Sequence, residues 1–159
     1  MVCGADEGYS MPLAVTLHSA LSNVSDNTEI DLYIVDGGFS PDTRNRLERV
    51  VRTSDHGTTR LHWATVDPSF IDELPTGKWV TASAYLRLFI PELLPSTTKK
   101  ALYLDSDVLV EADLTALWEK EMDDAPILAA QDFGAPYVSS GLGLTNYQEL
   151  NLPPDAPYF

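Results

Sequence analysis

Residues 29–52 read EIDLYIVDGGFSPDTRNRLERVVR, and this stretch decides the fold because a strand, a tight turn and a helix follow one another directly. Residues 29–35 alternate in polarity, which is typical of a strand. The Gly-Gly pair at 37–38 ends this strand, and Ser-Pro-Asp at 40–42 begins a helix whose arginines face water. A strand joined in this way to a helix is the repeating unit of α/β proteins.

The same alternation extends outward along the chain. The predicted strands cover residues 1–5, 29–35, 58–66, 101–110 and 127–131. The predicted helices cover residues 12–23, a segment that starts at 40–42, residues 81–90 ended by Pro91, and residues 114–118. The apolar run at 101–110 predicts a strand buried on both faces. We therefore predict an α/β fold, with a mostly parallel sheet that carries helices on both faces.

Composition limits the class of protein. The chain has 159 residues, of which 44% are hydrophobic and 21% charged, so it can bury the core of one domain and is not disordered. Its formal net charge is −14, which argues against nucleic acid as a partner because phosphate binding needs clustered Lys and Arg. Residues 101–159 hold 11 acidic side chains and one base, Lys120, which predicts a bound metal, a partner or further chain.

Cysteine content and hydropathy predict a cytoplasmic protein. Cys3 is the single cysteine, so no internal disulfide can form, and this composition fits a reducing compartment. The first residues lack the basic and apolar regions of a secretory signal. No stretch approaches the roughly 20 apolar residues that span a membrane.

Two carboxylates stand out in LYLDSDV, residues 102–108. Asp105 and Asp107 lie at the carboxyl end of a predicted strand, where open α/β sheets bind ligands. Side chains two residues apart share one face of a strand, so both could reach one hard cation such as Mg²⁺ or Mn²⁺. No Lys or Arg is near in sequence, so the two charges would repel without a cation. The alternative is that the two acids merely end a strand as it meets solvent.

The first turn, CGADEGY at residues 3–9, is the second candidate site. Asp6 could accept a hydrogen bond from a nucleobase N–H, and Tyr9 offers a flat face to a base. An ordinary turn with an exposed acid and a core tyrosine is the alternative. Arg87, in an apolar helix, could reach a phosphate, pair with the strand carboxylates, or do both. We interpret the three histidines as structural: His18, His56 and His62.

These pieces, in this order, resemble the family 8 glycosyltransferases, which are retaining, nucleotide-sugar-dependent enzymes. The matching stretches cover nearly the whole chain and are CGADEGY at 3–9, LHSAL at 17–21, IVDGG at 34–38, SAYLRL at 83–88, ALYLDSDVLV at 101–110 and LTALW at 114–118. The resemblance implies the nucleotide-sugar-binding, Rossmann-like fold called GT-A. It also implies a role in reactions such as lipopolysaccharide biosynthesis.

The resemblance implies a nucleoside site at the first turn. Asp6 and Tyr9 would hold the uracil of a UDP-sugar. Ala5 and Gly8 would line the base and ribose pocket, and the backbone of Ser106 would contact the ribose.

The resemblance also implies a metal and a site for the transferred sugar. Asp105 and Asp107 would ligate Mn²⁺, or Mg²⁺, which bridges the diphosphate. Arg87 would steady the phosphate and sugar, and Asp132 would touch the sugar hydroxyls. The reaction would transfer glucose or galactose, with retention of configuration, to an unknown glycan, lipid-linked glycan or protein.

In this family the third metal ligand, a histidine, and the acceptor-binding part lie downstream of a Tyr-Phe like that at 158–159. We therefore expect residues 1–159 to be a single domain, the amino-terminal, donor-binding portion of a longer enzyme. We expect little or no transfer activity from this portion alone. The longer protein would be cytoplasmic or peripheral at the inner face of the membrane.

Two other interpretations stay open. The chain could be a non-catalytic nucleotide-sugar-binding or assembly module, such as a homo-oligomer that covers unpaired strands. It could also be a phosphatase of the haloacid-dehalogenase type, in which Asp105 would be the nucleophile and Asp107 the general acid. That family expects its Asp-x-Asp strand near the chain start and a Gly-Thr or Gly-Val after it, whereas Val108 and Leu109 follow here.

Overall fold

The computed structural model describes residues 1–56, 58–67, 69 and 82–159. The chain divides into two compact units, Met1–Glu119 and Lys120–Phe159, and each is described here by itself. Within the described residues, no helix has the length and apolar character needed to cross a membrane. The single domain predicted from the sequence stays a prediction.

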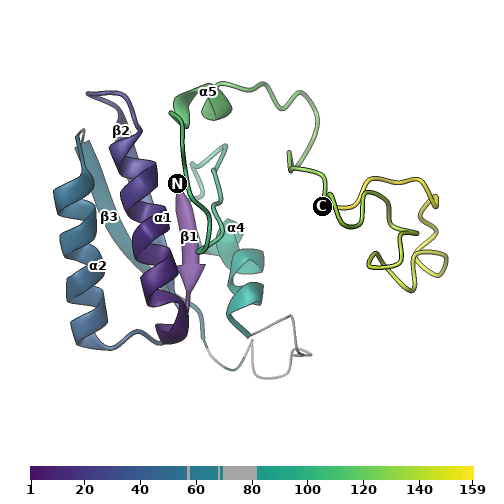
Figure 1. The fold of residues 1–159 in the computed structure, drawn as a ribbon, viewed down its shortest axis with the longest axis horizontal. Helices are drawn as coiled ribbons and strands as arrows, with labels where there is room; N and C mark the ends of the chain where they lie inside the picture. Colours follow the sequence, from purple (N-terminus) through teal and green to yellow (C-terminus); the bar gives the residue numbers. More distant parts are fainter. Residues whose placement is uncertain (57, 68, 70–81) are drawn as a thin grey trace. The chain divides into compact units, whose positions relative to one another are not determined.

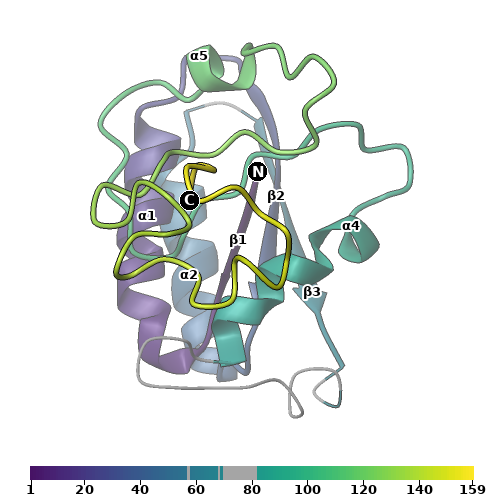
Figure 2. The same ribbon diagram turned by 90° about the vertical axis from the view of Figure 1, so that its right-hand side faces the viewer.

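The first unit is built on a parallel sheet of three strands, β1 (Val2–Ala5), β2 (Glu29–Asp36) and β3 (Thr58–Thr65), in the order β1-β2-β3. All three arrows point the same way in Figure 1 and Figure 2. The predicted strands at 1–5, 29–35 and 58–66 are therefore confirmed. Their common direction brings their carboxyl ends to one edge of the sheet.

Two helices, α1 (Ser10–Ser22) and α2 (Pro41–Ser54), cover one face of the sheet (Figure 1). The even-numbered residues Leu32 and Ile34 of β2 point to this face and join the buried core between sheet and helices. The core also contains the fully buried side chains of Leu13, Leu17, Leu21 and Leu47. The predicted helices at 12–23 and from 40 onward are confirmed.

The opposite face is covered by η2 (Ala82–Phe89), a 3₁₀ helix, and by α4 (Ile90–Leu93). Leu86 is buried there against Val2 and Val35 of the sheet, so helices lie on both faces as predicted. The helix predicted at 81–90 is a 3₁₀ helix over residues 82–89, and a separate α-helix, α4, starts at residue 90. Residue 81 lies outside the described residues. Pro91 lies in the first turn of α4 rather than ending a helix, because the missing N–H of a proline costs little there.

The strand predicted at 101–110 is wrong. Only its start pairs with the sheet, where Val2 N donates to Leu102 O at 2.8 Å and Leu104 N to Val2 O at 3.0 Å. Further along, the backbone of Val108 bonds to the Thr16 hydroxyl of α1, and Val110 N donates to Ser19 Oγ at 3.0 Å. Side chains of α1 therefore satisfy the backbone groups that a strand would offer to a neighbour. The apolar run is also not buried on both faces, since Leu109 is 64% exposed.

The short helix predicted at 114–118 is confirmed as α5 (Thr115–Trp118) in the first unit. In the second unit the strand predicted at 127–131 is wrong, because the described residues supply no strand beside it and a lone strand is not stable. Ile127 and Leu128 are both exposed. The second unit instead contains an isolated antiparallel β-bridge between Tyr137 and Pro157.

Asp113 links the loop after α1 to the start of α5. It accepts hydrogen bonds from Ser25 N at 3.0 Å and Thr115 N at 2.8 Å, and also from the Ser25 hydroxyl. These hydrogen bonds, with that of Ser25 the largest cause, lower the pKa of Asp113 to about 2. Because the folded pKa lies below the unfolded one, the stabilisation is complete above about pH 4 and is lost toward pH 2.

We predict that Asp113→Asn lowers the free energy of unfolding near neutral pH and loses this effect as the pH falls from about 4 toward 2. Urea unfolding of both proteins across this range measures the difference. The exposed neighbour Asp26 provides the control Asp26→Asn, which should show no such pH-dependent difference. A constant difference between Asp113→Asn and the parent chain at all pH values would contradict the assignment.

Candidate functional site

The carboxyl end of β1 turns directly into η1 (Glu7–Tyr9), a short 3₁₀ helix. Asp6 caps this turn, and its Oδ1 accepts hydrogen bonds from Gly8 N at 2.9 Å and Tyr9 N at 3.2 Å. These bonds fix the turn because an Asp side chain satisfies backbone N–H groups that have no helical partner. Tyr9 is 44% exposed, so its ring has an open face.

A second contact reaches Asp6 from the other side of the sheet. Ser83 Oγ, at the start of η2, donates to Asp6 Oδ2 at 2.9 Å. A carboxylate oxygen can accept two hydrogen bonds. Among the described contacts, Oδ1 already accepts two and Oδ2 accepts one, so Oδ2 can take one more from a ligand N–H.

Asp105 lies at the end of the short pairing between residues 102–104 and β1. Its Oδ1 accepts a hydrogen bond from Arg87 Nη2 at 2.7 Å and another from Tyr103 Oη at 3.0 Å. The Arg87 guanidinium also lies 5.0 Å from the centre of the Tyr103 ring. Burial, and next the charge of Asp105, raise the pKa of Tyr103, so its hydroxyl stays protonated and donates.

Arg87 therefore supplies a positive charge that the local sequence around Asp105 lacks. The expected repulsion between Asp105 and Asp107 is reduced by an arginine that lies 18 residues earlier in the chain. The ion pair is about half exposed, so it is weak as a source of stability. An exposed arginine held at a sheet edge is available to a phosphate.

The residues present fit a divalent cation in part. Asp105 and Asp107 offer the carboxylate oxygens that Mg²⁺ and Mn²⁺ prefer, and Asp107 is exposed. Among the described residues, no three His, Cys, Asp or Glu side chains are grouped as a metal site. Two protein carboxylates leave most of the coordination of such an ion to water and ligand oxygens.

The 3₁₀ helix η2 joins the two halves of the site. Ser83 contacts Asp6 and Arg87 contacts Asp105, and these two η2 residues are four apart in the sequence. A 3₁₀ helix rises about 2.0 Å per residue, so the backbones of these two residues are roughly 8 Å apart along its axis. Sequence reasoning did not select Ser83, Tyr103 or Glu7, since no local motif marks a residue whose partner is distant along the chain.

Three further predicted site residues are Ala5, Asp132 and Ser106. Ala5 is 1% exposed and its side chain belongs to the core, so only its backbone faces the turn. Asp132 lies in the second unit, where its Oδ1 accepts from Gly134 N at 2.6 Å and Ala135 N at 3.2 Å. Ser106 is half-buried beside Asp105.

Two histidines make contacts typical of structural residues. His18 Nδ1 lies 2.7 Å from Ser54 Oγ, which joins α1 to α2. His62 Nε2 lies 2.9 Å from Asp31 Oδ1, and its ring stacks on Tyr33 with centroids 4.5 Å apart. His56 lies between α2 and β3.

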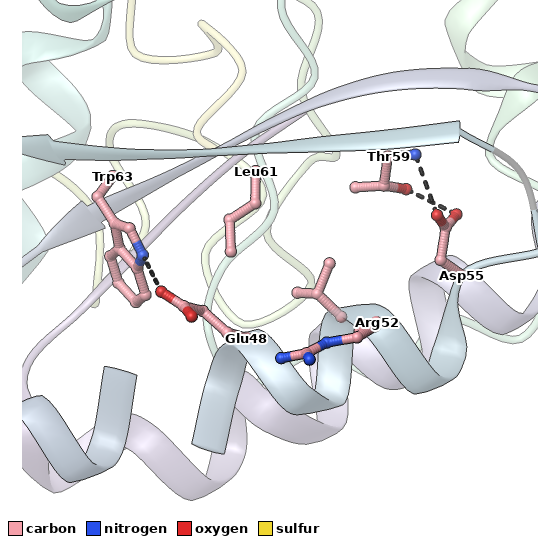
Figure 3. A pocket seen from close by; sticks show the side chains of 7 residues that line it. Glu48, Arg52, Asp55, Thr59, Leu61 and Trp63 are labelled. Atoms are coloured by element: carbon pink, nitrogen blue, oxygen red, sulfur yellow. Dashed lines mark hydrogen bonds between the residues drawn. The ribbon is translucent and has the colours of Figure 1, made fainter. Parts of the chain in front are cut away.

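Two cavities of the first unit are lined by residues away from this edge. One, of about 470 Å³, is at the amino ends of the strands, lined in part by Met1, Tyr33, Leu94 and Trp118. The other, of about 380 Å³, lies between α2 and β3, where Glu48 accepts from Trp63 and Asp55 from Thr59 (Figure 3). We favour the carboxyl edge of the sheet as the candidate site because the charged side chains of Asp6, Arg87 and Asp105 lie there, although neither cavity does.

Residues 1–152 match the family described as Glycosyl transferase family 8. The chain belongs to this family. General stress protein A of Bacillus subtilis is 31% identical over 84% of the chain, and Glycosyltransferase GlyF of Streptococcus pneumoniae is 29% identical over 83%. The lipopolysaccharide 1,2-glucosyltransferase of Escherichia coli is 24% identical over 81% of the chain.

Solved structures support the same family 8 fold. The galactosyltransferase LgtC, in a complex with donor and acceptor sugar analogues, matches 99% of the chain with a TM-score of 0.81 and 27% identity. The predicted GT-A-like α/β fold is therefore confirmed. The chain spans only part of the length of these relatives, from 31% of GlyF and 46% of General stress protein A to 54% of the LgtC chain.

Proposed function

We propose that this family 8 chain is the donor-binding portion of a retaining hexosyltransferase that uses a UDP-hexose and Mn²⁺ or Mg²⁺. The acceptor of the longer protein would be a glycan, a lipid-linked glycan or a protein. Families of this kind divide donor and acceptor recognition between parts of the chain, and the described site has groups suited to the donor.

The observation that carries the proposal is the double contact of η2. Ser83 bonds to Asp6 while Arg87 pairs with Asp105, so one short helix contacts both the carboxylate proposed to bind the base and the pair proposed to bind the phosphates. Both lie at the carboxyl edge of a parallel sheet, where α/β folds bind nucleotides. An elongated ligand with a base at one end and phosphates at the other suits this arrangement.

Each of these residues has a defined task in donor binding. The remaining acceptor position of Asp6 Oδ2 would take the N–H of uracil, and the exposed ring of Tyr9 would contact the base. Arg87 would bind the diphosphate while keeping its contact with Asp105. Asp105 and Asp107 would hold the cation, whose charge offsets the negative charge on the departing UDP. Asp132 would contact the sugar hydroxyls.

Nucleotide binding by the 159-residue chain tests the proposal. Isothermal titration calorimetry with Mn²⁺ present should detect one saturable site for UDP and weaker binding of ADP, because a purine cannot present the same N–H to Asp6. Equilibrium dialysis checks the result where the heat of binding is small. Absence of UDP binding by both methods would contradict a donor site.

The same titration, together with two further assays, separates an assembly module and a phosphatase from a donor site. An assembly module should bind neither nucleotide and should form a stable oligomer in light scattering, as expected for a chain that covers unpaired strands. A phosphatase should hydrolyse p-nitrophenyl phosphate and lose that activity in Asp105→Asn. Membership of a glycosyltransferase family favours the donor site over both.

A further inference from the structure

Glu7 makes a contact that the proposed donor site does not use. It is the residue after Asp6, and its exposed carboxylate contacts the start of α2. Ser40 N donates to Glu7 Oε2 at 2.8 Å, and the hydroxyls of Thr43 and Ser40 donate to Oε1 at 2.6 Å and 3.2 Å. One carboxylate thus accepts three hydrogen bonds from the first turn of a 14-residue helix.

The chemistry at this end of α2 favours a charged partner. The first N–H groups of a helix have no helical acceptor, and the helix dipole attracts negative charge there. Ser40 caps α2, and its Oγ accepts from Thr43 N at 3.2 Å while donating to Glu7. The hydrogen bond from Thr43, followed by that from Ser40 N, lowers the pKa of Glu7, so it is ionised at neutral pH.

Apart from the Asp6 cap, side chains of other elements hold the turn that Glu7 belongs to. No residue of η1 is buried, so apolar packing does not fix its position. Polar contacts hold it from two sides. Ser83 of η2 bonds to Asp6 on one side, and Ser40 and Thr43 of α2 bond to Glu7 on the other.

We infer that Glu7 is a positioning residue, which anchors η1 on the start of α2 and so keeps Asp6 and Tyr9 in place for the base. Glu7 itself does not touch the ligand. This inference rests on the proposed donor function. Glu7 would affect binding of the nucleoside but not of the phosphates, since the contact between Arg87 and Asp105 does not involve η1.

The test compares Glu7→Ala with the parent chain for three probes: uridine, UDP with Mn²⁺, and inorganic pyrophosphate with Mn²⁺. Loss of charged hydrogen bonds should weaken uridine and UDP binding by about tenfold. Pyrophosphate binding should be unchanged. Thr43→Val, which removes one of the three donors, should give the same pattern with a smaller loss.

A structural readout separates this inference from the proposed function. Amide hydrogen exchange at Gly8 and Tyr9 should become faster in Glu7→Ala, with or without a nucleotide. Glu48→Gln, which alters the contact of α2 with Trp63, is the control and should change neither exchange at η1 nor uridine binding.

The results of these experiments test the role of Glu7 and the donor site separately. Unchanged exchange at η1, or equal weakening of all three probes, would overturn the role of Glu7. Absence of UDP binding by the parent chain would overturn the donor site, and with it the role of Glu7 in nucleoside recognition. If Glu7→Ala does not fold, Glu7→Gln and Thr43→Val give the same comparison, since each keeps part of the contact.

Discussion

Replacing Asp105 with Asn should lower the affinity of the chain for UDP by about 100-fold when Mn²⁺ is present. The amide keeps an oxygen that accepts from Arg87 and Tyr103, so the local contacts are retained while the negative charge is lost. A neutral amide is a poor ligand for a hard cation that otherwise has two carboxylates. The loss of UDP affinity should therefore appear only when Mn²⁺ is present.

Calorimetric titrations of UDP in Mn²⁺ and in EDTA measure this separation. In EDTA, the parent chain and Asp105→Asn should bind UDP about equally, because Arg87 still binds the diphosphate. Asp31→Asn is the matched control, since Asp31 is likewise paired with an arginine, Arg60, but lies at the start of β2. An equal loss with and without Mn²⁺ would mean that Asp105 acts by holding Arg87 rather than a metal.

Gly37→Ala is expected to lower both the stability of the fold and UDP binding. Gly37 follows β2, and its N–H donates to Ala5 O at 2.9 Å at the end of β1. A Cβ at this position would lie 2.6 Å from Ala5 O and 3.2 Å from Asp6 Cα. The backbone of β1 would have to move, at a cost of about 2 kcal/mol in the free energy of unfolding.

That movement would reach the candidate site directly, because Asp6 begins the base-binding turn. Urea unfolding measures the stability, and UDP titration of the folded protein measures the site. Gly38→Ala provides the comparison, because Gly38 has φ +106° and nothing within 4 Å of an added Cβ. This variant should cost about 1 kcal/mol of strain and leave UDP binding unchanged. Equal UDP affinities in all three proteins would contradict the prediction.

The strands and helices that sequence predicted correctly have strong local patterns. Residues 29–36 alternate and end in Gly-Gly, and α2 begins at a Ser-Pro pair that caps a helix in the sequence itself. Residues 101–110 and 127–131 have equally apolar patterns, yet neither is a strand. A strand needs a neighbour for its backbone groups, and only the tertiary structure decides whether one is present.

The candidate site was likewise predicted only in part from the sequence. Asp6, Tyr9, Arg87 and Asp105 were predicted because their chemistry lies in short motifs. Their partners were not predicted, because Ser83 lies 77 residues from Asp6, and Ser40 and Thr43 lie 33 and 36 residues from Glu7. A pairing of Arg87 with the strand carboxylates was predicted as possible together with phosphate binding, and the structure shows the pairing with Asp105.

The sequence by itself determined the α/β class and the parallel direction of the strands, since these follow from patterns within a few neighbouring residues. It also determined the family, through the set of motifs in their order along the chain. The tertiary structure decided which groups meet at the sheet edge. It placed η2 across β1, so that Ser83 reaches Asp6 and Arg87 reaches Asp105. Hydrogen bonds form over about 3 Å in space, whatever the separation along the chain, so these pairings required the folded structure.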